Sequence, residues 1–341
     1  VFQGGEKNAR YSVIMNYGNQ NGLYNVPKTD TSSNELFRRY ALRTNLDFDM
    51  FRIFEARVSI GARIEEQKMP NYGWQESTYI NRSSSNTSSP IWNYLASYPS
   101  NVYPVRDKAS GNWSGTNLYP NNPVATVSDM GWRYYKTRVL QGNFELKEKL
   151  DGILEGLYAK EAYSFNSVAL VNYNKTSNFE RYQDGVKTTN DQATPITASN
   201  LYPMQQEDWK QASVTLGFDR SFGIHHLTSA INYHMSDYKG DGFFVINNHY
   251  QNISGRFNYT YKDKYVGELG FSYFGSDAFA PGNRWGFYPA ISAAWIVSNE
   301  DFLKDNAVVS RLKLRASAGK TGFAETDEGS LLSGQHGRYL Y

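Results

Sequence analysis

The 341-residue sequence lacks cysteine, a charge imbalance and any long apolar run. The absence of cysteine excludes disulfide bonds, thiolate metal sites and cysteine nucleophiles. Lysine and arginine number 35 against 33 aspartate and glutamate residues, so the formal net charge is only +2. A chain this close to neutral has no basic footprint for nucleic acid, which we do not expect as a partner. No run of apolar residues is long enough for a membrane-spanning helix.

The sequence also has few side chains that could form a catalytic or metal centre. Its five histidines are His225, His226, His234, His249 and His336. Adjacent side chains of a strand point to opposite faces, so the pair at 225 and 226 is a poor chelator. Ser236 and Asp237 lie beside His234, but neighbours along a strand do not form a catalytic triad. No Walker or dinucleotide-binding motif is present, and we predict no enzyme activity, no metal site and no cofactor.

What the chain does have is an alternation of apolar and polar residues with a period of two, which places successive side chains on opposite faces of a strand. It is clearest from Arg52 to Glu66. Six apolar residues share one face of that segment: Phe54, Ala56, Val58, Ile60, Ala62 and Ile64. The other face carries charges, among them Arg57 and Arg63. Similar segments recur, and we predict about eleven antiparallel strands in an all-β fold.

The links between the predicted strands alternate in length. Short links occur near residues 50–51, 148–152, 221–224 and 262–263. Long links span about residues 18–39, 67–131, 175–208, 239–250 and 275–285. Tight turns at one end and long loops at the other are typical of an outer-membrane barrel. We therefore predict that residues 1–341 form part of a transmembrane antiparallel β-barrel whose long links are extracellular loops.

The cost of placing charge in lipid predicts the orientation of the strands. If residues 52–66 were turned over, Arg57 and Arg63 would face lipid, at about 2 to 4 kcal/mol for each arginine near the midplane. We therefore expect the apolar face outside and a polar lumen inside. Alternation alone also fits a half-exposed sheet of a soluble or surface β-rich binding protein, and this alternative stays open. Strands of ten or more residues favour a membrane crossing, because soluble strands average about five to six residues.

Several segments resemble one family of barrel proteins. The segments are RWGFYPAISAAW (284–295), SNEDFL (298–303), LKLRASAGKTG (312–322), EKNARY (6–11), NQNG (19–22) and YALRTNLDF (40–48). Together they resemble the barrel of SusC/RagA-like TonB-dependent transporters of the Bacteroidota outer membrane. Ala318 and Phe323 depart from the tyrosine and asparagine that are frequent in the family. The resemblance is specific near the end of the chain and looser between residues 67 and 208.

The resemblance implies an interior barrel fragment of a larger, plugged barrel of about 22 strands. Such transporters import oligosaccharides or peptides across the outer membrane, together with a SusD-like surface lipoprotein and the TonB complex. The amino-terminal plug and the TonB-contacting segment have no counterpart in these residues. The expected partners are therefore the lipoprotein, the TonB complex through the missing region, outer-membrane lipid and a glycan or peptide substrate. A passive outer-membrane porin is the nearest alternative.

Two sets of residues are candidates for contacts with substrate, partner or plug. The long link from 67 to 131 is rich in aromatic residues, and aromatic faces beside amides and hydroxyls suit sugar rings or peptide side chains. The candidate substrate or partner contacts are Trp74, Trp92, Tyr94 and Trp113. The alternative is that these aromatics give the link a small core of its own. The candidate lumen- or plug-facing residues are Arg57, Arg63, Arg311, Lys313 and Arg315.

Two local features near the end of the chain carry expectations of their own. Pro289 lacks the amide that a regular ladder needs, so we expect it at the beginning of a strand or at a bulge. Residues 301–303 are expected to form a short helical turn, capped near Ser298 or Asn299.

Overall fold

The computed structural model describes residues 1–71, 90–188, 192–199, 202–241, 246–304, 306 and 308–322. One candidate contact residue, Trp74, lies outside the described residues. Within the described part, no helix is long and apolar enough to cross a membrane.

Twelve strands form one continuous antiparallel sheet in the described residues, and each pairs with the next along the chain. They are β1 (Phe2–Glu6), β2 (Ala9–Asn21), β3 (Leu36–Met50), β4 (Phe54–Pro70), β6 (Gly131–Lys149), β7 (Leu157–Asn178), β11 (Tyr202–Phe222), β12 (His225–Asp241), β13 (Ile246–Tyr261), β14 (Tyr265–Ser276), β15 (Trp285–Ile296) and β16 (Lys313–Gly319). A short strand, β10 (Thr194–Ala198), pairs with β7 outside this order.

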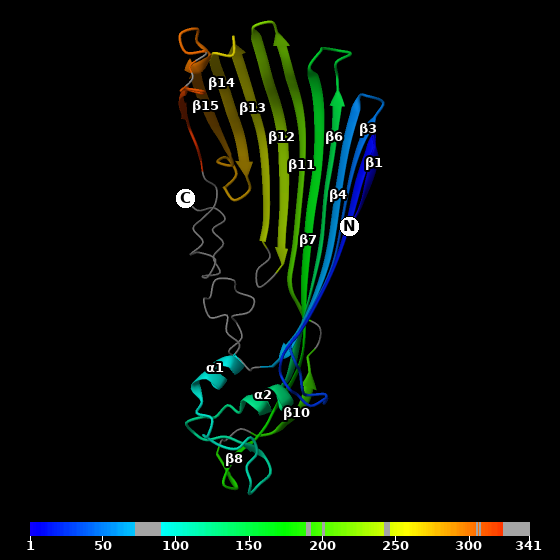
Figure 1. Cartoon of the computed structure of the whole chain (residues 1–341), viewed down its shortest axis with the longest axis vertical. Helices are drawn as coiled ribbons and strands as arrows, with labels where there is room; N and C mark the ends of the chain where they lie inside the picture. Colours follow the sequence, from blue (N-terminus) through cyan, green and yellow to red (C-terminus); the bar gives the residue numbers. More distant parts are fainter. Residues whose placement is uncertain are drawn as a thin grey trace.

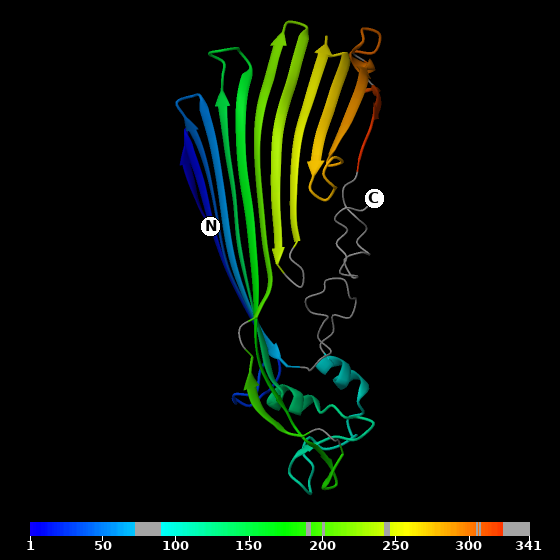
Figure 2. The same ribbon diagram turned by 180° about the vertical axis from the view of Figure 1, so that it is seen from behind.

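The sheet curves but does not close, and its two edges, β1 and β16, lie on opposite sides of the molecule in both views (Figures 1 and 2). The prediction of a partial antiparallel barrel is therefore confirmed. The consecutive order of the large sheet contains twelve strands in the described residues, one more than the eleven or so that the alternation indicated. The alternation over residues 153–173 fits either one long strand or two shorter ones, and the structure has the single strand β7 (Leu157–Asn178) there.

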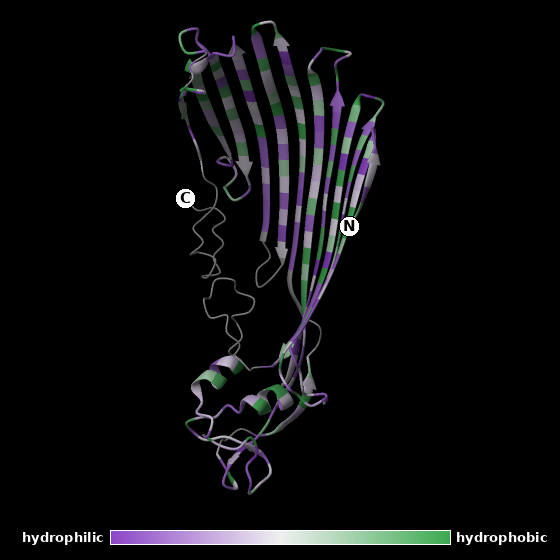
Figure 3. Cartoon of the chain, viewed as in Figure 1, coloured by the Kyte–Doolittle hydropathy of each residue, from purple (hydrophilic) through white to green (hydrophobic). Residues whose placement is uncertain are grey.

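The register of the strands gives the sheet two chemically different faces. Phe48, Ala56 and Leu146 stand side by side in one row across β3, β4 and β6, and the neighbouring row contains Asp47, Arg57 and Glu145. Because side chains alternate along a strand, all rows of the first kind share one face and all rows of the second kind share the other. We call these the apolar face and the polar face. Figure 3 shows the resulting bands of alternating hydropathy along the strands.

At one end of the sheet the strands are joined by short links. Phe51 and Arg52 between β3 and β4, and Lys262 and Asp263 between β13 and β14, all have positive φ. Two successive left-handed residues match the right-handed twist of a hairpin, although glycine or asparagine is the usual choice there. These turns therefore reverse the chain without the glycine or asparagine residues that usually indicate such a turn in a sequence.

The link between β15 and β16 also lies at this end. A 3-10 helix, η2 (Val297–Asn299), precedes the expected helical turn, and a single turn follows in which Lys304 N donates to Glu300 O at 2.8 Å. Pro289 lies inside β15 rather than at its start or at a bulge. The Pro289 carbonyl accepts from Lys320 N, which lies just beyond the end of β16. The amide that Pro289 lacks is therefore at a position where the ladder to β16 has already ended.

At the opposite end, three long links fold together into what we call the end module (residues 22–35, 90–130, 179–188 and 192–199). It contains α1 (Pro90–Ser97), α2 (Pro123–Asp129) and a three-stranded sheet of β5 (Trp113–Ser114), β8 (Arg181–Gln183) and β9 (Val186–Lys187). Both clusters of buried apolar residues in the described part lie here, one around Ile91 and Val127 and one around Trp113, Ala125 and Phe179. Neither cluster is centred on the described strands of the large sheet.

Glu300 anchors the link between β15 and β16, and its ionisation predicts how that link responds to acid. Its carboxylate accepts from Lys264 Nζ at 2.9 Å, Tyr265 Oη at 2.7 Å and Trp295 Nε1 at 3.0 Å. These hydrogen bonds, the one from Lys264 first, lower the pKa of Glu300 to about 2. Since the folded pKa is lowered, the stabilisation is present above the ordinary carboxyl pKa and is lost as the pH falls through about 2.

We therefore expect hydrogen exchange of the amides of residues 297–304 to stay slow from pH 7 down to about pH 3 once corrected for intrinsic rates. Glu300→Gln, which removes the charge, should make these amides exchange faster already at pH 7. Asp301→Asn is the matched control, because the Asp301 side chain is 95% exposed and its contact to Lys264 is 3.4 Å. Equal exchange in both variants would contradict the anchoring role of Glu300.

Candidate functional site

Charged side chains on the polar face pair with one another across neighbouring strands. The cross-strand ion pairs are Arg10–Asp47, Arg39–Glu65, Arg57–Glu145, Lys160–Glu145, Lys149–Glu55 and Arg256–Glu268, and Arg63 pairs with Glu65 within β4. Neutral groups do the same: Asn45 donates to Ser12 Oγ at 3.0 Å and accepts from Ser59 Oγ at 2.7 Å. The polar face is therefore a hydrogen-bonded wall whose charges are compensated from strand to strand.

The candidate lumen residues occupy different parts of this wall. Arg57 and Arg63 lie on the polar face of β4, where Arg57 Nη1 is 3.5 Å from Glu145 Oε1 and Arg63 Nε is 3.6 Å from Glu65 Oε1. Lys313 and Arg315 lie on the polar face of β16, the edge strand, in the rows of Ile296 and Ala294. Arg311 precedes β16 and belongs to the link at the short-turn end. Contact of any of these five with a plug remains a prediction.

Trp113 is the centre of the end module rather than part of its surface. The side chain is 7% exposed and packs against Phe179, with ring centroids 6.2 Å apart. Its Nε1 donates to Asp129 Oδ2 at 2.6 Å, and the Arg106 guanidinium lies 3.4 Å above the ring centroid. A ring enclosed in this way is unavailable to a substrate, so the structure places Trp113 in the small core that was the alternative interpretation.

Trp92 and Tyr94, both on α1, have different surroundings. Trp92 is 49% exposed, and its ring lies 6.1 Å from that of Tyr24. The two rings border a groove of about 470 Å³ that also has Leu23, Phe37 and the amide of Gln67 in its lining. Tyr94 is half-buried against the core cluster of Ile91 and Val127. Of the candidate contact residues that are described, only Trp92 offers an exposed ring beside a groove.

Tyrosines fill the space between α1 and the following loop. The rings of Tyr94 and Tyr98 lie 5.7 Å apart, and those of Tyr98 and Tyr119 lie 4.9 Å apart in an edge-on arrangement. Burial is the main cause that raises the pKa of Tyr103 to about 12, and Tyr103 Oη donates to Asn121 O at 3.1 Å. Tyr103 is therefore neutral at physiological pH, and the tyrosines of this group serve as packing and hydrogen-bonding groups.

Two polar residues hold the loops of the end module together, and sequence reasoning missed both. Asn122 caps α2 by accepting from Val124 N and Ala125 N, and its amide donates to Val105 O and Ser114 O. Asp107 accepts from Ser110 N at 2.7 Å and Gly185 N at 3.1 Å, and its hydrogen bond with the Ser110 hydroxyl is the main cause that lowers the pKa of Asp107. The Asn-Pro pair at 122–123 was a signal for a helix start; nothing local indicates the contact from Asp107 to Gly185.

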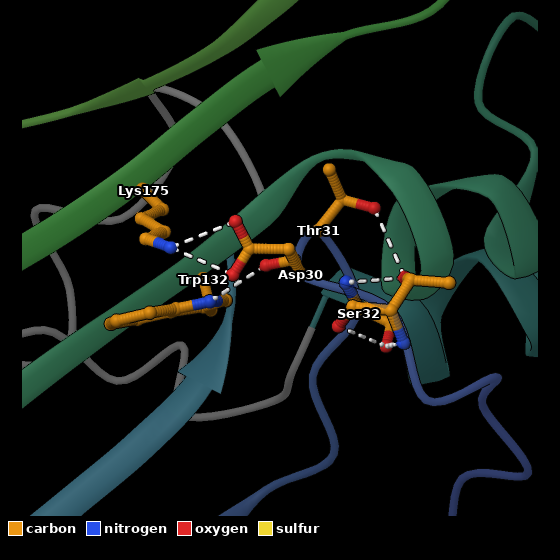
Figure 4. A network of polar contacts seen from close by, with 6 residues as sticks. Asp30, Thr31, Ser32, Trp132 and Lys175 are labelled. Atoms are coloured by element: carbon orange, nitrogen blue, oxygen red, sulfur yellow. Dashed lines mark hydrogen bonds and ion pairs between the residues drawn. The ribbon is translucent and has the colours of Figure 1, made fainter.

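A further polar network joins the end module to the sheet (Figure 4). Lys175 Nζ on β7 lies 2.7 and 2.9 Å from the two carboxylate oxygens of Asp30. Trp132 Nε1 on β6 donates to Asp30 O at 3.1 Å, and Lys68 Nζ lies 4.3 Å from the Trp132 ring centroid. Thr31 Oγ1 donates to Ser128 O at 2.9 Å. The link between β2 and β3 is thus tied to β6, to β7 and to α2.

None of these arrangements is a catalytic or metal centre. Among the described residues, no group of three or more histidine or acidic side chains could hold a metal ion. What the described residues provide is a two-faced sheet with a folded module at one end.

Comparisons with known proteins agree with this architecture. The chain is 23% identical to the TonB-dependent receptor P3 of Formosa agariphila over 357 residues, which cover 94% of this chain and 32% of that protein. It is 41% identical to the TonB-dependent receptor SusC of Bacteroides thetaiotaomicron over 68 residues, which cover 20% of this chain and 7% of that protein. No family model matches the chain.

Among solved structures, the RagAB peptide transporter superposes with a TM-score of 0.65 at 15% identity, covering 95% of this chain and 36% of that chain. The open sheet and these relatives define the class: the chain has the barrel fold of a TonB-dependent receptor. More particularly, the chain is SusC-like, and the resemblance seen in the sequence is confirmed. It spans about a third of the relatives that it matches along most of its length.

The different burial of the two tryptophans predicts different effects of their removal. In the full-length receptor, Trp113→Ala should destabilise the end module by about 3 to 5 kcal/mol, because it opens a cavity between Phe179 and Ala125. Limited proteolysis should then cut residues 90–130 much faster than in the unmodified protein. Trp92→Ala is the matched control and should leave cleavage nearly unchanged. Equal cleavage in the two variants would show that Trp113 is not a core residue.

Proposed function

We propose that this chain forms part of the barrel wall of a TonB-dependent outer-membrane importer. The importer takes up oligosaccharides or peptides and has a SusD-like lipoprotein at its extracellular mouth. In this proposal the chain crosses the outer membrane many times, the apolar face contacts lipid and the polar face borders the lumen. The extracellular side carries the long links, at about residues 18–39, 67–131, 175–208, 239–250 and 275–285. The plug and the TonB-contacting segment belong to parts of the protein outside these residues.

The observation that carries the proposal is the uncharged band on the apolar face. From Tyr40 to Phe48 on β3, and from Ala56 to Ile64 on β4, every side chain on this face is uncharged. Each segment has about nine residues, so it extends roughly 27 Å along the strand, or roughly 21 Å after a tilt of about 40°. This height is close to the apolar band of about 25 Å in outer-membrane barrels.

Two alternative functions can be distinguished from this proposal. A passive porin would share the band but would need neither energy coupling nor a lipoprotein. A soluble or surface β-rich protein would have to cover the exposed apolar side chains, such as Leu42, Met15 and Ile291, which are 42%, 64% and 57% exposed. Exposed apolar side chains recur on this face from β2 to β15, which favours lipid as the covering medium, because a large exposed apolar surface is unfavourable in water.

The absence of cysteine from these residues allows a direct test of orientation. Single substitutions Leu118→Cys in the end module and Ile153→Cys in a short turn would be made in the full-length receptor. The side chains are 77% and 78% exposed, so both are accessible in the purified protein. In intact cells, a membrane-impermeant maleimide should label position 118 and spare position 153 until the outer membrane is permeabilised. Labelling of position 153 alone would reverse the proposed orientation, and labelling of neither would argue against surface exposure.

The partner and the substrate class require a separate experiment. We expect the receptor, purified from detergent-solubilised outer membrane, to bring a lipoprotein with it and to have an intact mass near three times the 38.8 kDa of these residues. Energy-dependent uptake, measured with labelled oligosaccharide and labelled peptide in parallel, should stop when the proton gradient is dissipated. Uptake that persists without the gradient would favour a porin. Trp92→Ala should weaken uptake of the true substrate if the groove beside Tyr24 contacts it, and Phe302→Ala, in a short-end turn, is the control.

A further inference from the structure

Three cations gather on the apolar face at the edge of the uncharged band, at the end of the sheet that carries the long links. Arg38, Glu66 and Lys136 stand in one row across β3, β4 and β6. The adjacent row, one step toward the band, contains Tyr40, Ile64 and Arg138. We call Arg38, Lys136 and Arg138 the basic cluster. They come from three adjacent strands, so the sheet holds their spacing rigidly.

The basic cluster has more positive than negative charge. The two rows contain one carboxylate, that of Glu66, whose Oε1 lies 3.0 Å from Lys136 Nζ. Arg38 is within electrostatic reach of the same carboxylate and contacts Asn19 Oδ1 at 3.4 Å through Nε. The side chains of Arg38 and Arg138 are exposed. The pair of Lys136 and Glu66 is neutral, so two guanidinium groups remain to attract an anion from outside.

Directly below the basic cluster, the same face is apolar and exposed. Tyr40, Leu42, Ile64 and Leu140 are 45%, 42%, 39% and 47% exposed. A cationic row above an exposed apolar surface complements a molecule with an anionic head and a hydrocarbon tail. A free anion would use only the upper half of this surface.

The opposite boundary of the band carries charge of the other sign. At the short-turn end of β6 and β7, the charged residues on the apolar face are Glu148 and Glu161, which stand in the rows of Phe54 and Leu146. The same group of strands therefore presents cations at one boundary and carboxylates at the other. Basic residues are attracted to an anionic leaflet at about 1 kcal/mol each, and carboxylates are repelled from it.

We propose that Arg38 and Arg138, held beside Lys136, form a binding site for the phosphate of a lipid headgroup, with the lipid tail lying over Tyr40, Leu42 and Leu140. This inference rests on the proposed membrane placement, and with the proposed orientation the lipid belongs to the outer leaflet. The two guanidinium groups bind the phosphate oxygens, for which their planar donors are suited. The site is thus a fixed lipid position on the outside of the barrel wall.

The test uses the full-length receptor in detergent, with native mass spectrometry to count bound lipids. Phosphatidylglycerol is the anionic probe and phosphatidylcholine with the same chains is the zwitterionic one. Arg38→Gln together with Arg138→Gln removes two charges and keeps the pair of Lys136 and Glu66. We expect phosphatidylglycerol to bind roughly 25-fold more weakly to this double variant, about five-fold for each cation. Binding of phosphatidylcholine should not change.

The matched control is Lys210→Gln together with Lys239→Gln on the same face, where the register places these lysines opposite Asp237 and Asp208. This control should bind phosphatidylglycerol as the unmodified receptor does. Equal weakening in both double variants, or none in either, would overturn the site. Displacement of the lipid by millimolar inorganic phosphate would show a free-anion site and overturn the lipid assignment. Lipid binding in detergent does not depend on the orientation that the maleimide labelling measures. Reversed labelling would therefore place the lipid in the other leaflet. Failed lipid binding would leave the proposed orientation unaffected.

Discussion

Strand register is the constraint on which the rest of this structure depends. A slip of one residue in any strand would exchange its two faces and carry its charges onto the apolar side. On β4 such a slip would place Arg57 and Arg63 among Phe48, Leu146 and their neighbours. The ion pairs of the polar face add to this selection, because Arg57 meets Glu145 in only one register. Each pair lies at a surface and contributes little stability by itself, but a wrong register would lose all of them together.

The same constraint explains why the apolar core lies in the end module. In the proposed placement, with one face toward lipid and the other toward a lumen, the sheet has no second layer to pack against, so its side chains cannot form a dry interior. The links at the long end are free of this requirement and bury Trp113, Phe179 and Ile91 together. The end module is consequently held by ordinary burial, and the network of Asp30, Lys175 and Trp132 fixes it to the sheet.

The sheet could be predicted from the sequence because its signal is local. Alternation with a period of two is visible within a single strand, and the lengths of the links follow directly from the gaps between strands. The positions of the short turns near Phe51–Arg52 and Lys262–Asp263 follow from these gaps, but their left-handed conformation does not, because the residues are not glycine or asparagine. The end module depends on contacts between distant residues: Thr31 reaches Ser128 across 97 positions and Lys175 reaches Asp30 across 145. Composition could not separate the buried Trp113 from the exposed Trp92, since both are tryptophans in the same polar, aromatic-rich link.

The two faces of the sheet also differ in what their charges can reveal. On the polar face, cations and carboxylates pair across strands, so their positions mainly satisfy one another and say little about the surroundings. On the apolar face of β3 and β4, charge is absent from the band and appears only beyond its end at the long links. There it cannot be explained by internal pairing alone, because the row of Arg38 and the row of Arg138 hold three cations and one carboxylate. In the proposed membrane placement, charge left uncompensated at the edge of the lipid-facing surface is matched by the medium beyond that edge, so the outside of the wall carries information about the leaflet that the inside does not.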